Sequence, residues 1–246
     1  MKSPLIFYSF IIILFGLAFG ISYAKSNKKV ALPVPTVNTT AKPVTTEPVG
    51  KLKSKMTLQV AFMSEAPDGN WTNPWSNACE ETVTLMADKY YAGKKSIGIS
   101  EAKEYLINLF DKEEELFGTN RNSDSKQMLE IISKYANFKG EIKINPTADE
   151  IKKEIAAGRP VISLHRGFDL KNPNIEFSPT RSSYHTIIVV GYDDEKQAFI
   201  THDPGDEKDG EYLAYGYDLF MDSLHDYNVE DDKTDGPATV IFTSAK

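Results

Sequence analysis

The pattern of apolar and polar positions divides the chain into three stretches. Residues 5–24 form an uncharged run of bulky apolar side chains, and residues 25–55 show no apolar periodicity. From residue 56 onward, apolar residues recur first at helical spacing and then at strand spacing. This periodicity predicts a folded domain over residues 56–246, because a repeated apolar face needs a core to bury it.

Helical spacing dominates the first half of this domain. A helix is predicted to begin near Asn77, which can cap it, and Glu80 would complete a capping box. Three apolar residues at helical spacing from Cys79 predict the buried face of this helix: Val83, Met86 and Tyr90. Three further helices are predicted. The first spans residues 100–110. The second begins at the capping pair Asp124 and Gln127, and the third begins at the capping pair Thr147 and Glu150 and ends at Gly158.

Strands dominate the second half. The run HTIIVVGY is apolar at consecutive positions, which indicates a strand buried on both faces at the centre of a sheet. A turn separates it from the next strand and predicts a hairpin. The predicted strands are 58–63, 161–165, 185–192, 197–203 and 238–242, and a last helix is predicted near 219–225. Helices followed by an antiparallel sheet predict the α+β class.

The apolar run at residues 5–24 is expected to direct or tether the protein and to take no part in the fold. Its length matches a bilayer's hydrocarbon core, which favours an uncleaved anchor. Lys2 before it and the small residues Ser22 and Ala24 at its end also fit a cleaved signal peptide. We therefore expect an exported protein, membrane-anchored or secreted, with its domain outside the cytoplasm. Residues 25–55, rich in Pro, Thr, Val and Lys, are expected to form an extended linker.

Charge and cysteine content narrow the classes of partner. Lys2 is the only charge before residue 25, and residues 25–55 carry seven lysines and one glutamate. Residues 56–246 therefore keep 20 basic and 34 acidic side chains, a net charge of −14. A domain that acidic repels phosphate backbones, so we expect no nucleic-acid partner. A single cysteine excludes an intramolecular disulfide and multi-cysteine zinc sites, and we expect a monomer without metal or cofactor.

The one cysteine, Cys79, is the candidate nucleophile. At a helix start, free backbone N–H groups and the positive end of the helix dipole stabilise a thiolate. Glu80 and Glu81 oppose this effect, because neighbouring carboxylates disfavour another negative charge. The alternative is a small buried core residue, the ordinary fate of a lone cysteine.

A thiol nucleophile needs a base, and the base needs a group that orients it. If residues 193–195 form a three-residue loop, the hairpin places His185 directly opposite Asp203. A carboxylate in that position can hold the imidazole, whereas a slip of one residue would put the two side chains on opposite faces.

The other histidines are weaker candidates. His165 ends another strand and is the second choice for the base. His202 should point away from Asp203, with a surface or supporting role, and His225 is expected to be solvated.

Three segments carry a resemblance to a known family: APDGNWTNPWSNACEETVTLMADKYY, then YHTIIVVGYD, then FITHDPG. In this order they resemble the peptidase C39-like family of the papain-like cysteine peptidase superfamily, over essentially all of residues 56–246. The resemblance implies a papain-like fold, in which N-terminal helices carry the nucleophile and pack on a C-terminal antiparallel sheet. It also implies that Cys79 is the nucleophile, His185 the general base and Asp203 the residue that orients the base.

The sequence departs from the papain-like pattern at the oxyanion site. These enzymes usually carry a glutamine a few residues before the cysteine, and here the sixth residue before Cys79 is Asn73. Its amide donates the same hydrogen bond from a shorter side chain. The Asn73 amide and the Cys79 backbone N–H are therefore the candidate oxyanion donors.

These features together predict an extracytoplasmic cysteine hydrolase, a peptidase that acts on peptide or protein substrates through a Cys-His-Asp triad and an acyl-enzyme. Two alternatives stay open. One is a catalytically inactive C39-like domain that binds peptide or cell-wall material, and the other is an acyl transferase of transglutaminase-like type.

Overall fold

The computed structural model describes residues 52–177 and 183–246. The chain divides into two units, Met1–Pro48 and Val49–Lys246, and all of the described residues belong to the second. The predicted apolar segment at residues 5–24 and most of the predicted linker lie outside the described residues. In the part of the chain that is described, no helix is both long and apolar enough to cross a bilayer.

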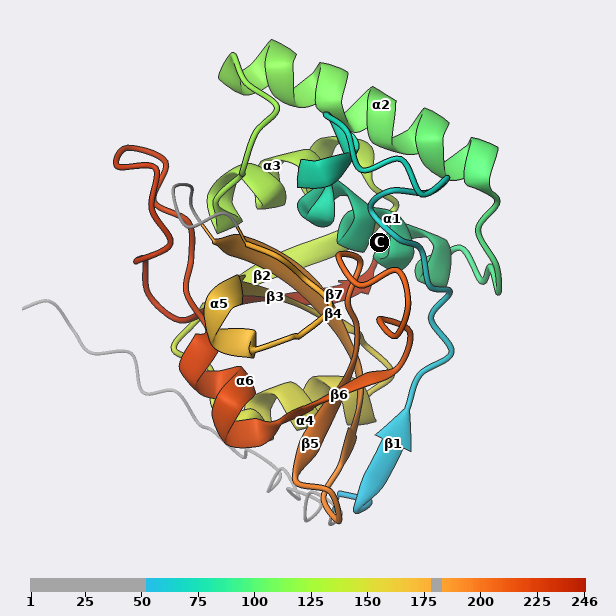
Figure 1. Cartoon of the computed structure of the whole chain (residues 1–246). Helices are drawn as coiled ribbons and strands as arrows, with labels where there is room; N and C mark the ends of the chain where they lie inside the picture. Colours follow the sequence, from blue (N-terminus) through green and yellow to red (C-terminus); the bar gives the residue numbers. More distant parts are fainter. Residues whose placement is uncertain (1–51, 178–182) are drawn as a thin grey trace, which may run out of the picture. The chain divides into compact units, whose positions relative to one another are not determined.

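The domain is built on a seven-stranded antiparallel sheet (Figure 1). The strands are β1 (Lys55–Thr57), β2 (Phe138–Ile144), β3 (Val161–Arg166), β4 (Tyr184–Asp193), β5 (Ala198–His202), β6 (Leu213–Gly216) and β7 (Thr239–Ala245). Their order is β2-β7-β3-β4-β5-β6, with β1 also paired to β4. Every residue of β4 is buried, which confirms the predicted central strand.

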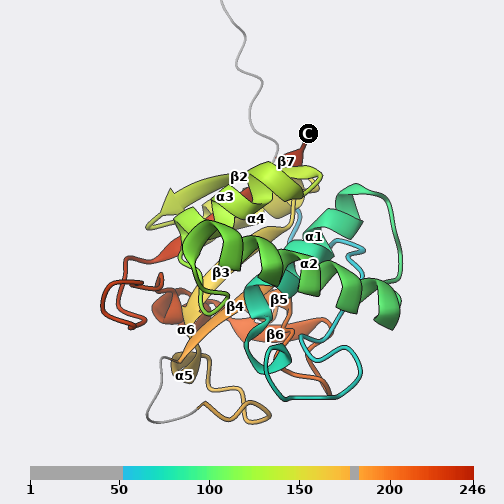
Figure 2. The ribbon, with the colours of Figure 1, turned by 90° about the horizontal axis from the view of Figure 1, so that it is seen from above.

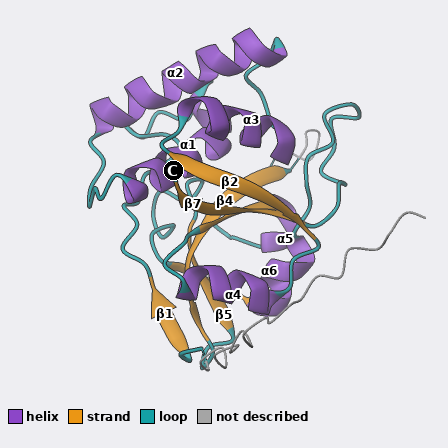
Figure 3. Ribbon diagram, turned by 180° about the vertical axis from the view of Figure 1, so that it is seen from behind, coloured by secondary structure: helices purple, strands orange, loops and turns teal. Residues whose placement is uncertain are grey.

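Helices cover both faces of this sheet. They are α1 (Cys79–Tyr91), α2 (Ile99–Phe117), α3 (Ser125–Tyr135), α4 (Ala148–Ala156), α5 (Gly167–Leu170) and α6 (Tyr217–Ser223), and a 3-10 turn, η1 (Trp75–Asn77), precedes α1. Figures 1 and 3 show α1, α2 and α3 on one side of the sheet and α4, α5 and α6 on the other. Figure 2 shows α2 as the outermost helix over α1 and α3. The α+β class is confirmed.

Local capping fixes where two of the helices begin. In α3, the backbone N–H of Gln127 donates to the Asp124 side chain at 2.8 Å, and a reciprocal bond closes the capping box. In α4, the N–H of Glu150 donates to Thr147 at 3.2 Å in the same motif. Both boxes form as predicted, since each satisfies backbone donors that the first helical turn leaves free.

Three expectations about elements were wrong or incomplete. Residues 58–63 form no strand: they run on from β1 as a buried segment, tied to β4 by a 2.7 Å bond from the Leu58 N–H to the Val190 carbonyl. Helix α2 extends seven residues past Phe110, and it ends where Gly118 adopts a left-handed conformation. Strands β2 and β6, which were not predicted, lie at the sheet edges, where exposed residues interrupt the apolar alternation.

The predicted hairpin register is also wrong. In place of the predicted three-residue loop 193–195, Asp193 pairs with Ala198, so the loop holds the four residues 194–197. The Asp193 side chain accepts the N–H groups of Glu195 and Lys196, which fixes this wider turn. A β-bulge between Val189 and Gly191 then moves the register back by one residue, so that Val189 pairs with Thr201 and Ile188 with His202.

Candidate active site

Helix α1 presents Cys79 as its first residue. The preceding residue, Ala78, has no side-chain cap, so the predicted capping box of Asn77 and Glu80 is wrong. Glu80 turns inward, and its carboxylate accepts the Cys79 S–H at 2.9 Å and the backbone N–H of Ser123 at 2.9 Å. The helix start is therefore stabilised through a buried carboxylate at its second position, close to the thiol.

Strand β4 and the turn after β5 bring His185 to Asp203. The His185 Nε2–H donates to Asp203 Oδ1 at 2.6 Å, and both side chains are buried. Asp203 is held in turn by the Gly205 N–H at 3.1 Å and by the Tyr215 hydroxyl at 2.6 Å. Burial alone would lower the pKa of His185, but the charge and hydrogen bond of Asp203 outweigh it and raise that pKa.

The two residues meet although the predicted register fails. Ile188 pairs with His202, and one further step along this ladder places Asp203 across from Ile187. His185 is two residues from Ile187 and so lies on the same face, as a diagonal neighbour of Asp203. The contact therefore needs the bulge, because the wider loop alone would not place Asp203 on this face.

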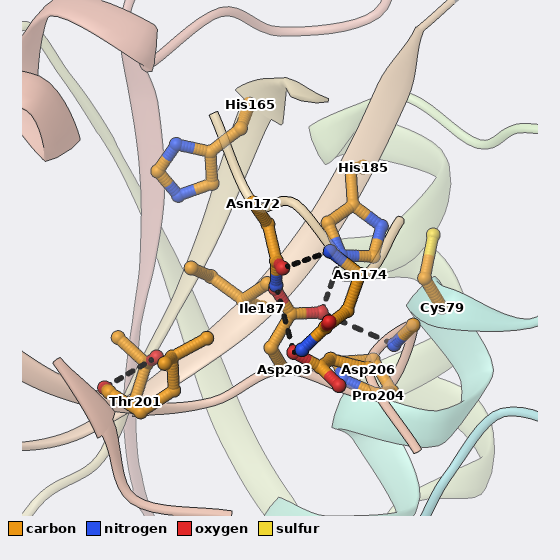
Figure 4. A network of polar contacts seen from close by, with 12 residues as sticks. Cys79, His165, Asn172, Asn174, His185, Ile187, Thr201, Asp203, Pro204 and Asp206 are labelled. Carbon is orange, nitrogen blue, oxygen red and sulfur yellow. Dashed lines mark hydrogen bonds and ion pairs between the residues drawn. The ribbon is translucent and has the colours of Figure 1, made fainter. Parts of the chain in front are cut away.

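Cys79 lies beside the free edge of the His185 ring (Figure 4). The Cys79 sulfur, a ring nitrogen of His185 and a carboxylate oxygen of Glu65 all lie within 4.8 Å of one another. Because Nε2 is bound to Asp203, Nδ1 is the nitrogen left to face the thiol. The structure thus brings together the three residues that the sequence singled out, and it adds Glu65.

The same three atoms have the composition of a metal site. Among the described residues they are the one group of histidine, cysteine and acidic side chains close enough to share an ion. A cation bound there would occupy both the nucleophile and the base.

The surroundings keep the thiol protonated at rest. Burial raises the pKa of Cys79 well above its ordinary value, and the charges of Glu80 and Glu65 raise it further. These effects outweigh the helix dipole that favours a thiolate. A base would therefore have to remove this proton before Cys79 could act as a nucleophile.

Cys79 and His185 open into a pocket of about 550 Å³. One wall comes from the segment before α1 and consists of Glu65, Trp71, Ser76 and Asn77. The other wall comes from the loop after α5 and consists of Asn174, Ile175, Glu176 and Phe177. Gly205 lies under the ring, where a Cβ would come within 2.9 Å of Cε1 of His185. The glycine in the Asp-Pro-Gly turn is therefore required for the imidazole to occupy this position.

A second pocket of about 760 Å³ adjoins the first and shares Ser76, Asn77 and Asn122 with it. Asn73 lines only this second pocket, where its side chain accepts the Ser76 hydroxyl at 3.1 Å. The structure therefore does not bring the predicted oxyanion amide of Asn73 into the pocket of Cys79.

The other three histidines support the fold. His165 is fully buried, with its ring nitrogens 2.8 Å from the hydroxyls of Ser223 and Ser163, and burial lowers its pKa well below the ordinary value. His202 is buried too, bonded to the Val60 carbonyl at 2.9 Å, so it is not a surface residue. His225 follows α6 and is partly buried.

Sequence reasoning missed two residues of the site. Tyr215 holds Asp203 from β6, a strand that the apolar pattern did not reveal. Glu65 gave one signal: it is the only charged residue between Lys55 and Asp68, in an otherwise apolar or neutral run.

The chain is similar to several known proteins. The solved structures that resemble the chain include a C39-like peptidase from Bacillus anthracis, at 15% identity and a TM-score of 0.49, covering 78% of this chain and 98% of that one. Xylellain, a cysteine protease from Xylella fastidiosa, matches at 12% identity and a TM-score of 0.35, covering 80% of this chain and 87% of that one. A comparison with curated proteins returns no match. Residues 57–229 match the model of the Peptidase_C39 like family, and the chain belongs to that family.

Proposed function

We propose that the protein is a cysteine peptidase in which Cys79 attacks the substrate, His185 is the general base and Asp203 orients the base. The observation that carries the proposal is the convergence of a helix-start cysteine and a carboxylate-bound histidine at one pocket. Membership of the family supports a peptide or protein substrate.

The geometry supports a reaction in two halves. His185 Nδ1 takes the thiol proton as the sulfur attacks the scissile carbonyl carbon, and then gives that proton to the leaving amine. Water next attacks the thioester carbonyl, losing a proton to His185, and the sulfur leaves as the new carboxyl product forms. Asp203 keeps the ring in the tautomer whose Nδ1 is free to accept.

Export is part of the same proposal. It rests on the apolar run at residues 5–24 and the extended composition of residues 25–55.

The test is cleavage of a complex peptide mixture by the full chain, with products identified by mass spectrometry. We expect new termini with the wild-type chain and a loss of about 10³-fold or more in Cys79→Ala and His185→Ala, because both act in one step. Cleavage by Cys79→Ala at the wild-type rate, or no cleavage by the wild type, would contradict the proposal.

A binding domain without turnover is the second candidate, and the hydrogen bond from the Cys79 thiol to Glu80 favours it. The same experiment separates the two functions, since a binding domain retains peptides without cutting them. Adding a primary amine also tests acyl transfer, which would leave the amine covalently attached to the acyl product.

A further inference from the structure

Asn172, the second residue after α5, is buried between two carboxylates of the turn after β5 (Figure 4). Its side-chain nitrogen lies 3.1 Å from Asp206 Oδ2, 3.0 Å from the Tyr215 hydroxyl and 3.5 Å from Asp203 Oδ2. An amide nitrogen carries two hydrogens, so Asp206 and Tyr215 take them and the contact with Asp203 is the weakest of the three. Asn172 does not line the pocket of Cys79, so an effect on the reaction has to pass through the residues that it bonds.

The partners of the Asn172 amide fix which way it faces. Its oxygen accepts the backbone N–H of Asn174 at 2.9 Å, so its nitrogen is the end that faces the carboxylates. Asp206 is 1% exposed, and its side chain also accepts the Asn174 amide at 3.0 Å and the backbone N–H of Lys208 at 3.1 Å. Burial alone would raise the pKa of Asp206, but hydrogen bonds from the backbone and from the two amides outweigh it and lower that pKa. Asp206 is therefore an acceptor with no proton to give, and Asn172 is the donor.

The Tyr215 hydroxyl connects Asn172 to Asp203. This hydroxyl has one proton, and it donates that proton to Asp203 Oδ2 at 2.6 Å. A phenolic proton can point to either side of its ring, and Asn172 donates to the Tyr215 oxygen from another direction. The proton therefore cannot turn toward Asn172, and it stays on the bond to Asp203. Hydrogen bonds that run in one direction through a buried site strengthen one another.

This bond holds the half of the Asp203 carboxylate that His185 does not contact. Asp203 Oδ1 accepts the His185 Nε2–H at 2.6 Å and the Gly205 N–H at 3.1 Å. Because the Tyr215 hydroxyl holds Oδ2, the carboxylate cannot rotate about its own axis. Rotation would lengthen the bond to His185 and release the ring from its orientation.

We propose that Asn172 is a positioning residue of the proposed active site: it directs the Tyr215 proton to Asp203 and so holds the carboxylate that orients His185. Asp206 acts one step further out, because it fixes the Asn172 amide. The inference rests on the proposed peptidase function, in which the His185 ring has to face Cys79 in one orientation.

The test is the rate of Cys79 alkylation by iodoacetamide at pH 7 in the full chain, which contains no other cysteine. Asn172→Leu keeps the size of the side chain and removes its donors, and Tyr215→Phe removes only the hydroxyl. We expect each change to slow alkylation by about 10-fold, the effect of losing one hydrogen bond to a charged group. The double variant should be within about twofold of Tyr215→Phe, because both changes break the same chain of bonds.

Asp206→Asn tests the same chain of bonds without altering Asn172 or Tyr215. It replaces an acceptor oxygen with a donor, so the Asn172 amide loses its fixed partner and alkylation should slow by about fivefold. In the Tyr215→Phe chain the same change should have no further effect. Asp218→Asn, an exposed change on α6, is the matched control and should react at the wild-type rate. If circular dichroism shows that Asn172→Leu does not fold, Asp206→Asn decides the question.

Peptide cleavage separates positioning from a purely structural role in the loop after α5. We expect kcat of Asn172→Leu to fall by about 10-fold while KM stays within about twofold of wild type. Three results would each overturn the inference: a change confined to KM, alkylation of Asn172→Leu at the wild-type rate, or effects of Asn172→Leu and Tyr215→Phe that multiply in the double variant. If the alkylation pattern holds and the wild type cleaves no peptide, the peptidase proposal fails and the positioning role stands.

Discussion

At the scale of the residue, the site depends on how each polar atom is held. Asp203 accepts the His185 N–H, the Gly205 N–H and the Tyr215 hydroxyl, so its carboxylate has one fixed orientation. A fixed carboxylate in turn fixes which ring nitrogen of His185 faces Cys79. The proposed role of Asp203 is therefore positional and electrostatic.

Asp203→Asn tests that role. The amide can donate to the ring and so favours the wrong tautomer, and it cannot stabilise an imidazolium ion. We expect kcat to fall by about 100-fold or more with a much smaller change in KM. Asp209→Asn is the control, because Asp209 is exposed in the same loop and contacts neither Cys79 nor His185. A variant that keeps the wild-type kcat would show that Asp203 has no part in the reaction.

The sequence carried enough information for part of this site. Cys79, His185 and Asp203 stand at a helix start, at the start of a strand and after the next strand, where spacing gives a signal. Glu65 has no such spacing, since the bond from its N–H to Pro204 joins segments about 140 residues apart. Asn73 failed because position along the chain does not show into which of two pockets a side chain turns.

At the scale of the element, the contact of α1 with α2 buries charge. Glu81 on α1 and Glu113 on α2 are 1% and 2% exposed. Burial and the charge of Glu80 together raise the pKa of Glu113 to about 8, although its interaction with Glu81 lowers it. Burial and the charge of Glu113 also raise the pKa of Glu81 well above its usual range. These helices therefore pack best when their carboxyl groups are neutral.

This packing makes folding depend on pH. Between about pH 4.5 and pH 8 the folded state keeps the Glu113 proton and the unfolded state loses it, so the free energy of unfolding falls as pH rises. We expect Tm to be higher at pH 5 than at pH 8, and Glu113→Gln to flatten part of that slope. Glu114→Gln, exposed on the same helix, should leave the slope unchanged. An identical slope in Glu113→Gln would contradict this account.

Element prediction succeeded where local chemistry decides the outcome. The capping boxes at Asp124 and Thr147 involve residues three apart, and both form. The hairpin register failed because the Asp193 side chain widens the turn and because a bulge interrupts β4 between Val189 and Gly191. Side-chain bonds to the backbone of this kind leave no trace in the apolar pattern.

At the scale of the whole domain, the site forms where three distant parts of the chain meet: the start of α1, the start of β4 and the turn after β5. The α+β class followed from the order of helices and strands. The lateral order of the sheet did not, because β7, the last strand, inserts between β2 and β3. Such long-range pairing depends on contacts that no local window contains.

The central claim is that His185 activates Cys79, and the most direct measurement is the rate of Cys79 alkylation by iodoacetamide at pH 7 in the full chain. Burial and Glu80 hold the thiol protonated, so its reaction requires a base within reach. We predict that His185→Ala alkylates about 100-fold more slowly than wild type, while circular dichroism shows both to be folded. Equal rates in the two proteins would contradict the account, because Cys79 would then react without His185.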